Sequence, residues 1–159
     1  MAAARELSLR HTVASLAYRA AKALRDTPVD FSDFRAGEGS RTAGEILSHL
    51  CDLLDWALSQ ARGKQRWRDS TQEAWNKDAE RFFAALKAFD DYLASEEPLH
   101  TPAENLFQGA VADALTHVGQ IALLRRLAGA AVRPENYAVA KIEIGHTGPD
   151  QNAPRKEFD

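Results

Sequence analysis

The 159-residue chain has a single cysteine, Cys51, and no long hydrophobic run. One cysteine excludes an internal disulfide, and the longest apolar runs are far too short to cross a bilayer. The N-terminal sequence MAAARELSLR also lacks the apolar core of a signal peptide. These absences predict a soluble cytoplasmic protein that does not associate with membranes.

Clustered positive charge is missing as well. Charged residues make up 27% of the chain and the formal net charge is −3. No run of Lys and Arg is long enough to follow a phosphate backbone, so nucleic-acid binding is not expected. The sequence also contains no Gly-rich phosphate loop, no Ser-His-Asp order and no C-x-x-C pair. Function must therefore be sought in some other arrangement of polar residues.

The dominant positive feature of the sequence is helical periodicity. Without internal repeats, a chain of this length makes about one domain, residues 1–159. Apolar residues recur at three- and four-residue spacing in four segments, at about 5–26, 42–62, 71–95 and 102–129. Four amphipathic helices of this length predict an all-α four-helix bundle. Residues 130–159, which contain several prolines and glycines, predict an irregular tail packed on the bundle.

Local signals predict where these helices begin and end. Capping boxes are expected at Thr42–Glu45 and at Ser70–Glu73, where a hydroxyl and a glutamate or glutamine side chain satisfy free amides. Thr101–Pro102 provides a start signal for the fourth helix. Gly63 and Gly129 are expected to end the second and fourth helices.

The fourth predicted helix carries the most informative polar residues. Its apolar stripe is expected to contain Phe107, Ala110, Ala114, His117, Ile121, Leu124 and Ala128. His117 stands in the middle of this stripe, and Asp113 lies one turn earlier on the same face. Residues four apart on a helix have Cβ atoms about 5–6 Å apart, so this pair can share a metal ion. Alternatively, Asp113 accepts a hydrogen bond that satisfies a buried His117 ring.

A third candidate ligand, His49, lies on the apolar side of the second predicted helix. Two histidines and one carboxylate leave coordination positions open for water or substrate, as in catalytic metal sites. Such a set suits zinc or nickel, with iron or manganese as alternatives. The sequence therefore predicts a metal site formed by His49, Asp113 and His117.

Neighbouring residues receive structural interpretations. Glu45 is accounted for by its capping box, and Cys51 is expected to be a small core residue rather than a nucleophile. Gln120 is expected to hydrogen-bond near the site. Asp52 is placed on the wetter side of its helix, and Arg125 is interpreted as a surface charge.

Two motifs resemble the DinB-like superfamily of metal-binding four-helix bundles. They are RTAGEILSHLCDLLDW at residues 41–56, and HVGQ followed by LLRRLAG within residues 117–129. The resemblance implies an up-down-down-up bundle that is frequently dimeric, with a metal between the helices at one end. His49 matches the superfamily's histidine on the second helix, and His117 matches the last histidine of its H-x-x-x-H pair. At the first position of that pair this chain has Asp113 instead.

The superfamily includes bacterial thiol-dependent S-transferases. The resemblance therefore implies a homodimeric, metal-dependent enzyme that transfers a small-molecule thiol to an electrophile. A closely related alternative reaction is hydrolysis by metal-activated water. The alternative is a non-catalytic helical dimer or ligand-binding module with a degenerate metal site, which the aspartate favours. The residues themselves identify neither the thiol nor the electrophile.

Overall fold

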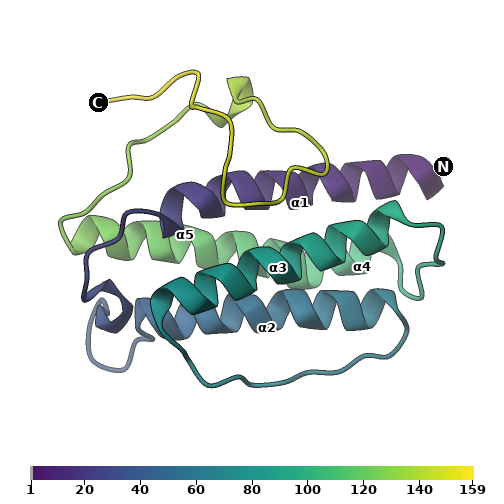
Figure 1. Cartoon of the computed structure of the whole chain (residues 1–159), viewed down its shortest axis with the longest axis horizontal. Coiled ribbons are helices and arrows are strands. Elements are labelled where there is room, and N and C mark those ends of the chain that lie inside the picture. Colours follow the sequence, from purple (N-terminus) through teal and green to yellow (C-terminus); the bar gives the residue numbers. More distant parts are fainter. Residues whose placement is uncertain (1) are drawn as a thin grey trace.

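The computed structural model of the chain describes residues 2–159, with side chains from Leu7 onward. It is an all-α bundle. The first three helices are α1 (Ala2–Leu24), α2 (Ala43–Ala61) and α3 (Trp75–Ala94). The fourth is continuous and consists of α4 (Ala103–Leu106), a π-helical turn (Phe107–Val111) and α5 (Ala112–Leu127). Figure 1 confirms the predicted up-down-down-up order, because α1 and the fourth helix run one way and α2 and α3 run the other.

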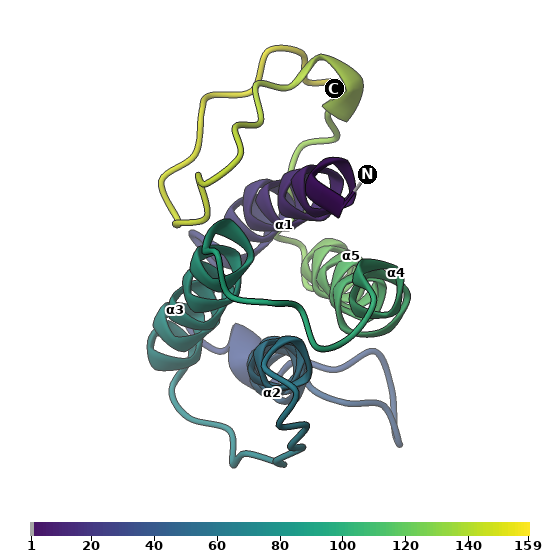
Figure 2. The same ribbon diagram turned by 90° about the vertical axis from the view of Figure 1, so that its right-hand side faces the viewer.

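Apolar side chains from all four helices meet in one core. Its largest fully buried members include Leu16 of α1, Leu50 and Leu54 of α2, and Phe82 and Phe89 of α3. Viewed along the bundle, the helices surround this core and the tail lies outside α1 (Figure 2). None of the helices within residues 2–159 combines the length and the apolar character that crossing a membrane requires.

The parallel arrangement of α2 and α3 requires a crossover, residues 62–74, that runs back along the bundle (Figure 1). Asp52 of α2 fastens this crossover. Its carboxylate accepts hydrogen bonds from the Ser70 amide at 2.8 Å, from the Ser70 hydroxyl at 2.6 Å and from Arg81 at 2.6 Å. Asp52 is only 5% exposed, so its predicted position on the wetter side was wrong.

The predicted capping box at Ser70–Glu73 was also wrong. The Ser70 hydroxyl is bonded to Asp52, and α3 begins five residues later, at Trp75. Its N-cap residue, Ala74, makes no side-chain hydrogen bond. The capping pattern fails because both of its groups bond elsewhere: the Ser70 hydroxyl donates to Asp52, and the Glu73 amide donates to the Asp78 carboxylate instead of to Ser70.

The other helix ends agree more closely with their sequence signals. Thr42 and Glu45 form the predicted capping box, with bonds of 3.1 and 2.7 Å. Gly63 and Gly129 follow α2 and α5 with φ of 69° and 76°, the left-handed conformation that ends a helix. The fourth helix begins at Ala103, one residue later than the Thr101–Pro102 signal predicts, and its N-cap, Pro102, makes no side-chain hydrogen bond.

The π-helical turn changes which residues of the fourth helix face the core. Leu106 is fully buried, whereas Phe107, which was predicted to be in the stripe, is 46% exposed. Between Leu106 and Val118 the π-helical turn contains one residue more than a regular α-helix would. Around the helix axis, Val118 therefore points within about 20° of Leu106, whereas His117 points about 80° away from it. Val118 is accordingly buried, and His117 lies beside the core rather than in the middle of the stripe.

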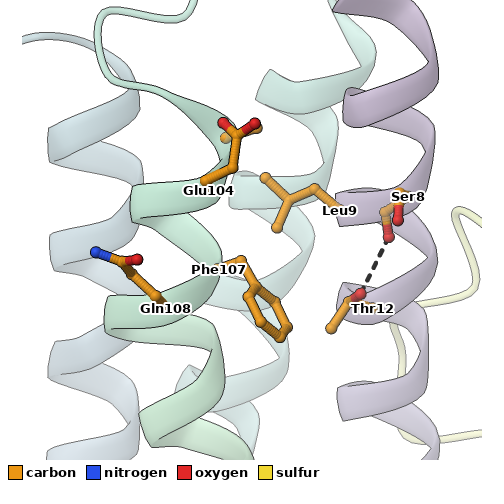
Figure 3. Close-up of a pocket in the computed structure, with 7 residues that line it drawn as sticks. Ser8, Leu9, Thr12, Glu104, Phe107 and Gln108 are labelled. Atoms are coloured by element: carbon orange, nitrogen blue, oxygen red, sulfur yellow. Dashed lines mark hydrogen bonds between the residues drawn. The ribbon is translucent and has the colours of Figure 1, made fainter.

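Phe107 instead lines a hollow of about 490 Å³ between α1 and α4 (Figure 3). Leu9 and Ala103 contribute apolar surface to it, and Ser8 and Thr12 contribute polar groups. The outward turn of Phe107 is therefore a direct result of the register change in the π-helical turn.

Arg125 was predicted to be a surface charge, but it is only 6% exposed. Its guanidinium donates hydrogen bonds to backbone carbonyl groups at the C-terminal end of α1 and just beyond α5. The acceptors belong to Lys22, Ala23, Arg25, Asp26 and Ala130. Helix C-termini leave carbonyl groups without intrahelical partners, which explains why a buried cation is stable there.

The tail is irregular, as predicted, apart from a short 3₁₀ turn at Tyr137–Val139. Its main attachment is to α1. Glu135 accepts hydrogen bonds from Tyr18 at 2.5 Å and from Lys22 at 3.1 Å, and Lys22 also bonds Glu157 at 2.7 Å. Glu135 and Glu157 form an isolated antiparallel bridge, so both ends of the tail are held at one place on α1.

Candidate metal centre

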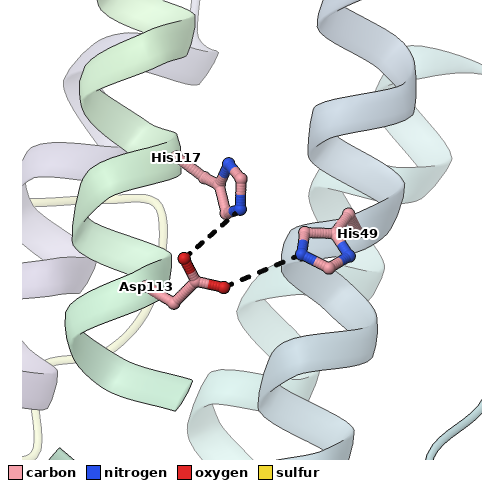
Figure 4. A group of neighbouring side chains, drawn as sticks. All are labelled: His49, Asp113 and His117. Carbon is pink, nitrogen blue, oxygen red and sulfur yellow. Dashed lines mark ion pairs between the residues drawn. The ribbon is translucent and has the colours of Figure 1, made fainter. Parts of the chain in front are cut away.

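The structure brings His49, Asp113 and His117 together between α2 and α5 (Figure 4). The Asp113 carboxylate lies 3.6 Å from His117 Nε2 and 3.8 Å from His49 Nε2, with a different oxygen facing each ring. One nitrogen or oxygen atom from each residue lies within 4.8 Å of the others. Among the described residues, these are the three side chains grouped closely enough to hold a metal ion.

These separations are too long for hydrogen bonds, which end at about 3.2 Å between nitrogen and oxygen. The alternative in which Asp113 accepts a hydrogen bond from His117 is therefore not formed. Ligand atoms about 2.1 Å from one tetrahedral ion lie roughly 3.4 Å from one another. The two separations from Asp113 are close to that value, and the whole group lies within 4.8 Å, so a side-chain movement of about 1 Å brings all three residues onto a single ion.

His117 is held by Gln120, which lies one turn later. The Gln120 side-chain oxygen is 2.7 Å from His117 Nδ1, as expected for a residue near the site. Because that oxygen can only accept, Nδ1 carries the hydrogen and Nε2 presents its lone pair towards Asp113. A histidine that donates its second nitrogen in this way has its tautomer and ring orientation fixed for metal binding.

His49 lies on the α2 side of the group, with its side chain 20% exposed. Burial lowers the pKa of His49, and the nearby charges of Arg41 and His117 act in the same direction, against the opposing effect of Asp113. The neutral form that results is the one that binds metal ions. Asp113 is 49% exposed, so one side of the group remains accessible to solvent and to small molecules.

Two tryptophans border the group. The Trp67 ring packs edge-to-face on His49 at 5.6 Å and on Trp56 at 5.9 Å between ring centroids. Trp67 belongs to the crossover, and its indole nitrogen donates to Asp69. The sequence did not predict Trp67 at this site, because nothing in the spacing relates residue 67 to residue 49.

Trp56 lies on the side of the group towards the π-helical turn. A Cβ added at Gly109, within that turn, would lie 3.8 Å from the Trp56 ring. That separation is ordinary van der Waals contact, so the indole packs beside this turn. The π-helical turn ends two residues before Asp113, and such turns are common near functional sites.

Other candidate residues lie outside the group. Cys51 is fully buried, its thiol donates to the Asp78 carbonyl, and burial raises the pKa of this thiol to about 12. It is a core residue, as predicted, and not a nucleophile. Glu45 is occupied by its capping box. His11 and His100 are exposed.

Comparison of the chain with family models, with curated proteins and with solved structures finds no match. The DinB-like resemblance therefore rests on the motifs around His49 and His117 alone.

Proposed function

We propose that this chain binds a divalent metal ion through His49, Asp113 and His117 and uses it to activate a small thiol or water. The observation that carries the proposal is the convergence of three donor side chains, from two helices, at separations too long for hydrogen bonds. A carboxylate and an imidazole lone pair that face each other without a hydrogen bond, with a second imidazole beside them, are stabilised when a cation lies between them.

The donor set fits such an ion. Two imidazoles and a carboxylate suit zinc or nickel, with iron or manganese as alternatives. When bound, a divalent ion lowers the pKa of a coordinated thiol or water and supplies a nucleophilic anion at neutral pH. Gln120 keeps the Nε2 lone pair of His117 directed at the site, and Trp67 shields the ring of His49.

The chemistry of a transferase is proposed from the DinB-like resemblance. In that proposal a small-molecule thiol attacks an electrophile on the exposed side of Asp113, and the functional unit is a homodimer. Hydrolysis differs only in the nucleophile. No side chain besides the three ligands is proposed as a general base.

A second candidate is a non-catalytic module that binds metal or ligand without turnover. Asp113, which stands where the resembling superfamily has histidine, favours it. A carboxylate in place of an imidazole can weaken the site or change its metal preference.

Metal content decides between a metal centre and a packed polar cluster. The protein, purified without a histidine tag, is reconstituted separately with zinc, nickel and manganese, and with iron(II) under anaerobic conditions. After desalting, its metal is measured by mass spectrometry. We expect about one equivalent of the preferred metal. His49→Ala and His117→Ala should each retain below about a tenth of that, while the exposed control His11→Ala binds as the wild type does.

A wild-type protein that holds less than about a tenth of an equivalent under every condition would refute the metal proposal. If the metal binds, loss of free thiol is followed with a fluorogenic electrophile and a panel of cellular thiols. Turnover that disappears in His117→Ala supports the transferase, whereas absent turnover with a full metal complement supports the binding module. Asp113→His should increase metal affinity if the aspartate is the weak ligand.

A further inference from the structure

A second hollow, of about 350 Å³, lies on the other side of α5, between α1, α5 and the tail. Gly119, which contributes to it, follows His117 by two residues and so lies about 200° around the helix from it. The hollow is therefore separate from the candidate metal centre. Small-molecule pockets span roughly 300–1,000 Å³, which places this one in the range for a short ligand.

The floor of the hollow is apolar and open. Ala23, Leu115, Val118 and Ala122 line it, and Val132 of the tail closes one side. A Cβ added at Gly119 would meet no other atom within 4 Å, so the glycine leaves real space above the helix.

The charge of the hollow is positive. Its charged lining residues are Arg19 and Lys22, and no carboxylate lines it in the part of the chain that the structure describes. Lys22 is already neutralised by Glu135 and Glu157. The Arg19 guanidinium lies over the Tyr137 ring, 3.9 Å from its centroid. This stacking fixes the guanidinium plane and leaves its N–H groups at the edge to donate to an anion.

From these contacts we propose that the hollow binds a small anionic amphiphile, a monocarboxylate with a short alkyl body. The carboxylate pairs with Arg19, and the alkyl chain covers the apolar floor over Gly119. A cationic amphiphile of the same length has no partner there and is repelled by Arg19. This inference does not depend on the proposed metal chemistry, because the two sites share no residue.

Sodium octanoate is the test ligand, and octylamine hydrochloride is its cationic counterpart. Both are titrated into the ¹⁵N-labelled full chain at constant ionic strength, and amide shifts are followed by NMR. We expect saturable shifts with octanoate, centred on Leu115, Gly119 and Ala122, with a dissociation constant on the order of 1 mM. Octylamine should produce no saturable shift at these amides.

Variants test the carboxylate contact with Arg19 and the alkyl contact over Gly119 separately. Arg19→Gln should weaken octanoate binding about tenfold, whereas Arg35→Gln, an exposed arginine on the α1–α2 loop, should leave it unchanged. Gly119→Leu should abolish binding because its side chain fills the open space. Ala122→Met fills the same hollow and provides a second test if Gly119→Leu is poorly folded. Ala84→Leu adds an exposed leucine on α3 and should bind as the wild type does.

The proposal is overturned by any of three results. The first is the absence of saturable shifts up to about 10 mM octanoate, which would also follow if another copy of the chain covered this face. The second is an equal response to octylamine. The third is undiminished octanoate binding in both folded filling variants.

Discussion

The buried position of Arg125 makes a quantitative prediction about stability. Three of its hydrogen bonds are well formed, at 2.6 Å to Arg25 O, 2.9 Å to Ala130 O and 3.1 Å to Ala23 O. Burial lowers the pKa of the guanidinium, but these carbonyl groups compensate the buried charge. At about 1–1.5 kcal/mol for each of the three bonds, the substitution Arg125→Met should reduce the free energy of unfolding by about 3–4.5 kcal/mol.

That loss is large for a domain whose total stability is about 5–15 kcal/mol. Methionine keeps much of the aliphatic volume, so the loss reports the hydrogen bonds rather than a cavity. The assay is urea unfolding followed by circular dichroism at 222 nm. The dependence of the unfolding free energy on urea concentration is fitted separately for each variant. Arg125→Lys should recover less than half of the loss, because a single ammonium group cannot reach carbonyl groups arranged around a planar guanidinium.

Arg126 is the matched control. It is the next residue, it is exposed, and Arg126→Met should change the free energy of unfolding by less than about 0.5 kcal/mol. If Arg125→Met also costs less than about 1 kcal/mol, the carbonyl cluster is satisfied by water, and the reasoning from buried hydrogen bonds is refuted.

Three further predictions concern the attachments between elements. Burial alone would raise the pKa of Asp52, but hydrogen bonds from the crossover and α3 outweigh it and hold the pKa below its ordinary value. Its contribution is therefore complete above the unfolded carboxyl pKa of about 3.9 and is lost as the pH falls through the lower folded value. Asp52→Asn should cost about 2 kcal/mol at pH 7, and its difference from the wild type should shrink below about pH 4 in urea titrations; a difference independent of pH would contradict this. Thr42→Ala should cost about 1 kcal/mol of stability because the helix cap is lost. Ala74→Ser should add up to about 1 kcal/mol, because it supplies a cap at the uncapped start of α3. Melting temperatures equal to that of the wild type in both variants would show that capping contributes little. Lys22→Met leaves a buried carboxylate without its cation, so it should cost about 3 kcal/mol and speed tryptic cleavage within residues 130–159; cleavage at the wild-type rate would show that other contacts hold the tail.

Local sequence signals succeeded where their partners lie close in the chain. The Thr42–Glu45 capping box needs only residues three apart, and the structure contains it. The convergence of His49 with His117 was also predicted, because the sequence placed both histidines on the apolar sides of their helices, and these sides face one another in a bundle. The proximity of the three candidate ligands follows from this facing of the helices and from the four-residue spacing of Asp113 and His117.

The failures involve partners distant in sequence. Ser70 has the pattern of a helix cap, but Asp52, eighteen residues earlier, accepts its hydroxyl hydrogen. Arg125 was predicted to be exposed because its acceptors are carbonyl groups about a hundred residues away, which no local pattern reveals. Trp67 was not assigned to the site because only the path of the crossover brings it to His49.

The π-helical turn at Phe107–Val111 has a consequence for comparing this chain with other sequences. It holds one residue more than an α-helix needs to join Leu106 to Val118 in their observed directions. Deleting one residue there would leave both flanks facing as they do now. A related chain without the extra residue must therefore be aligned with a single-position gap in this turn. An ungapped alignment would match either Leu106 or His117 to its true equivalent, but never both.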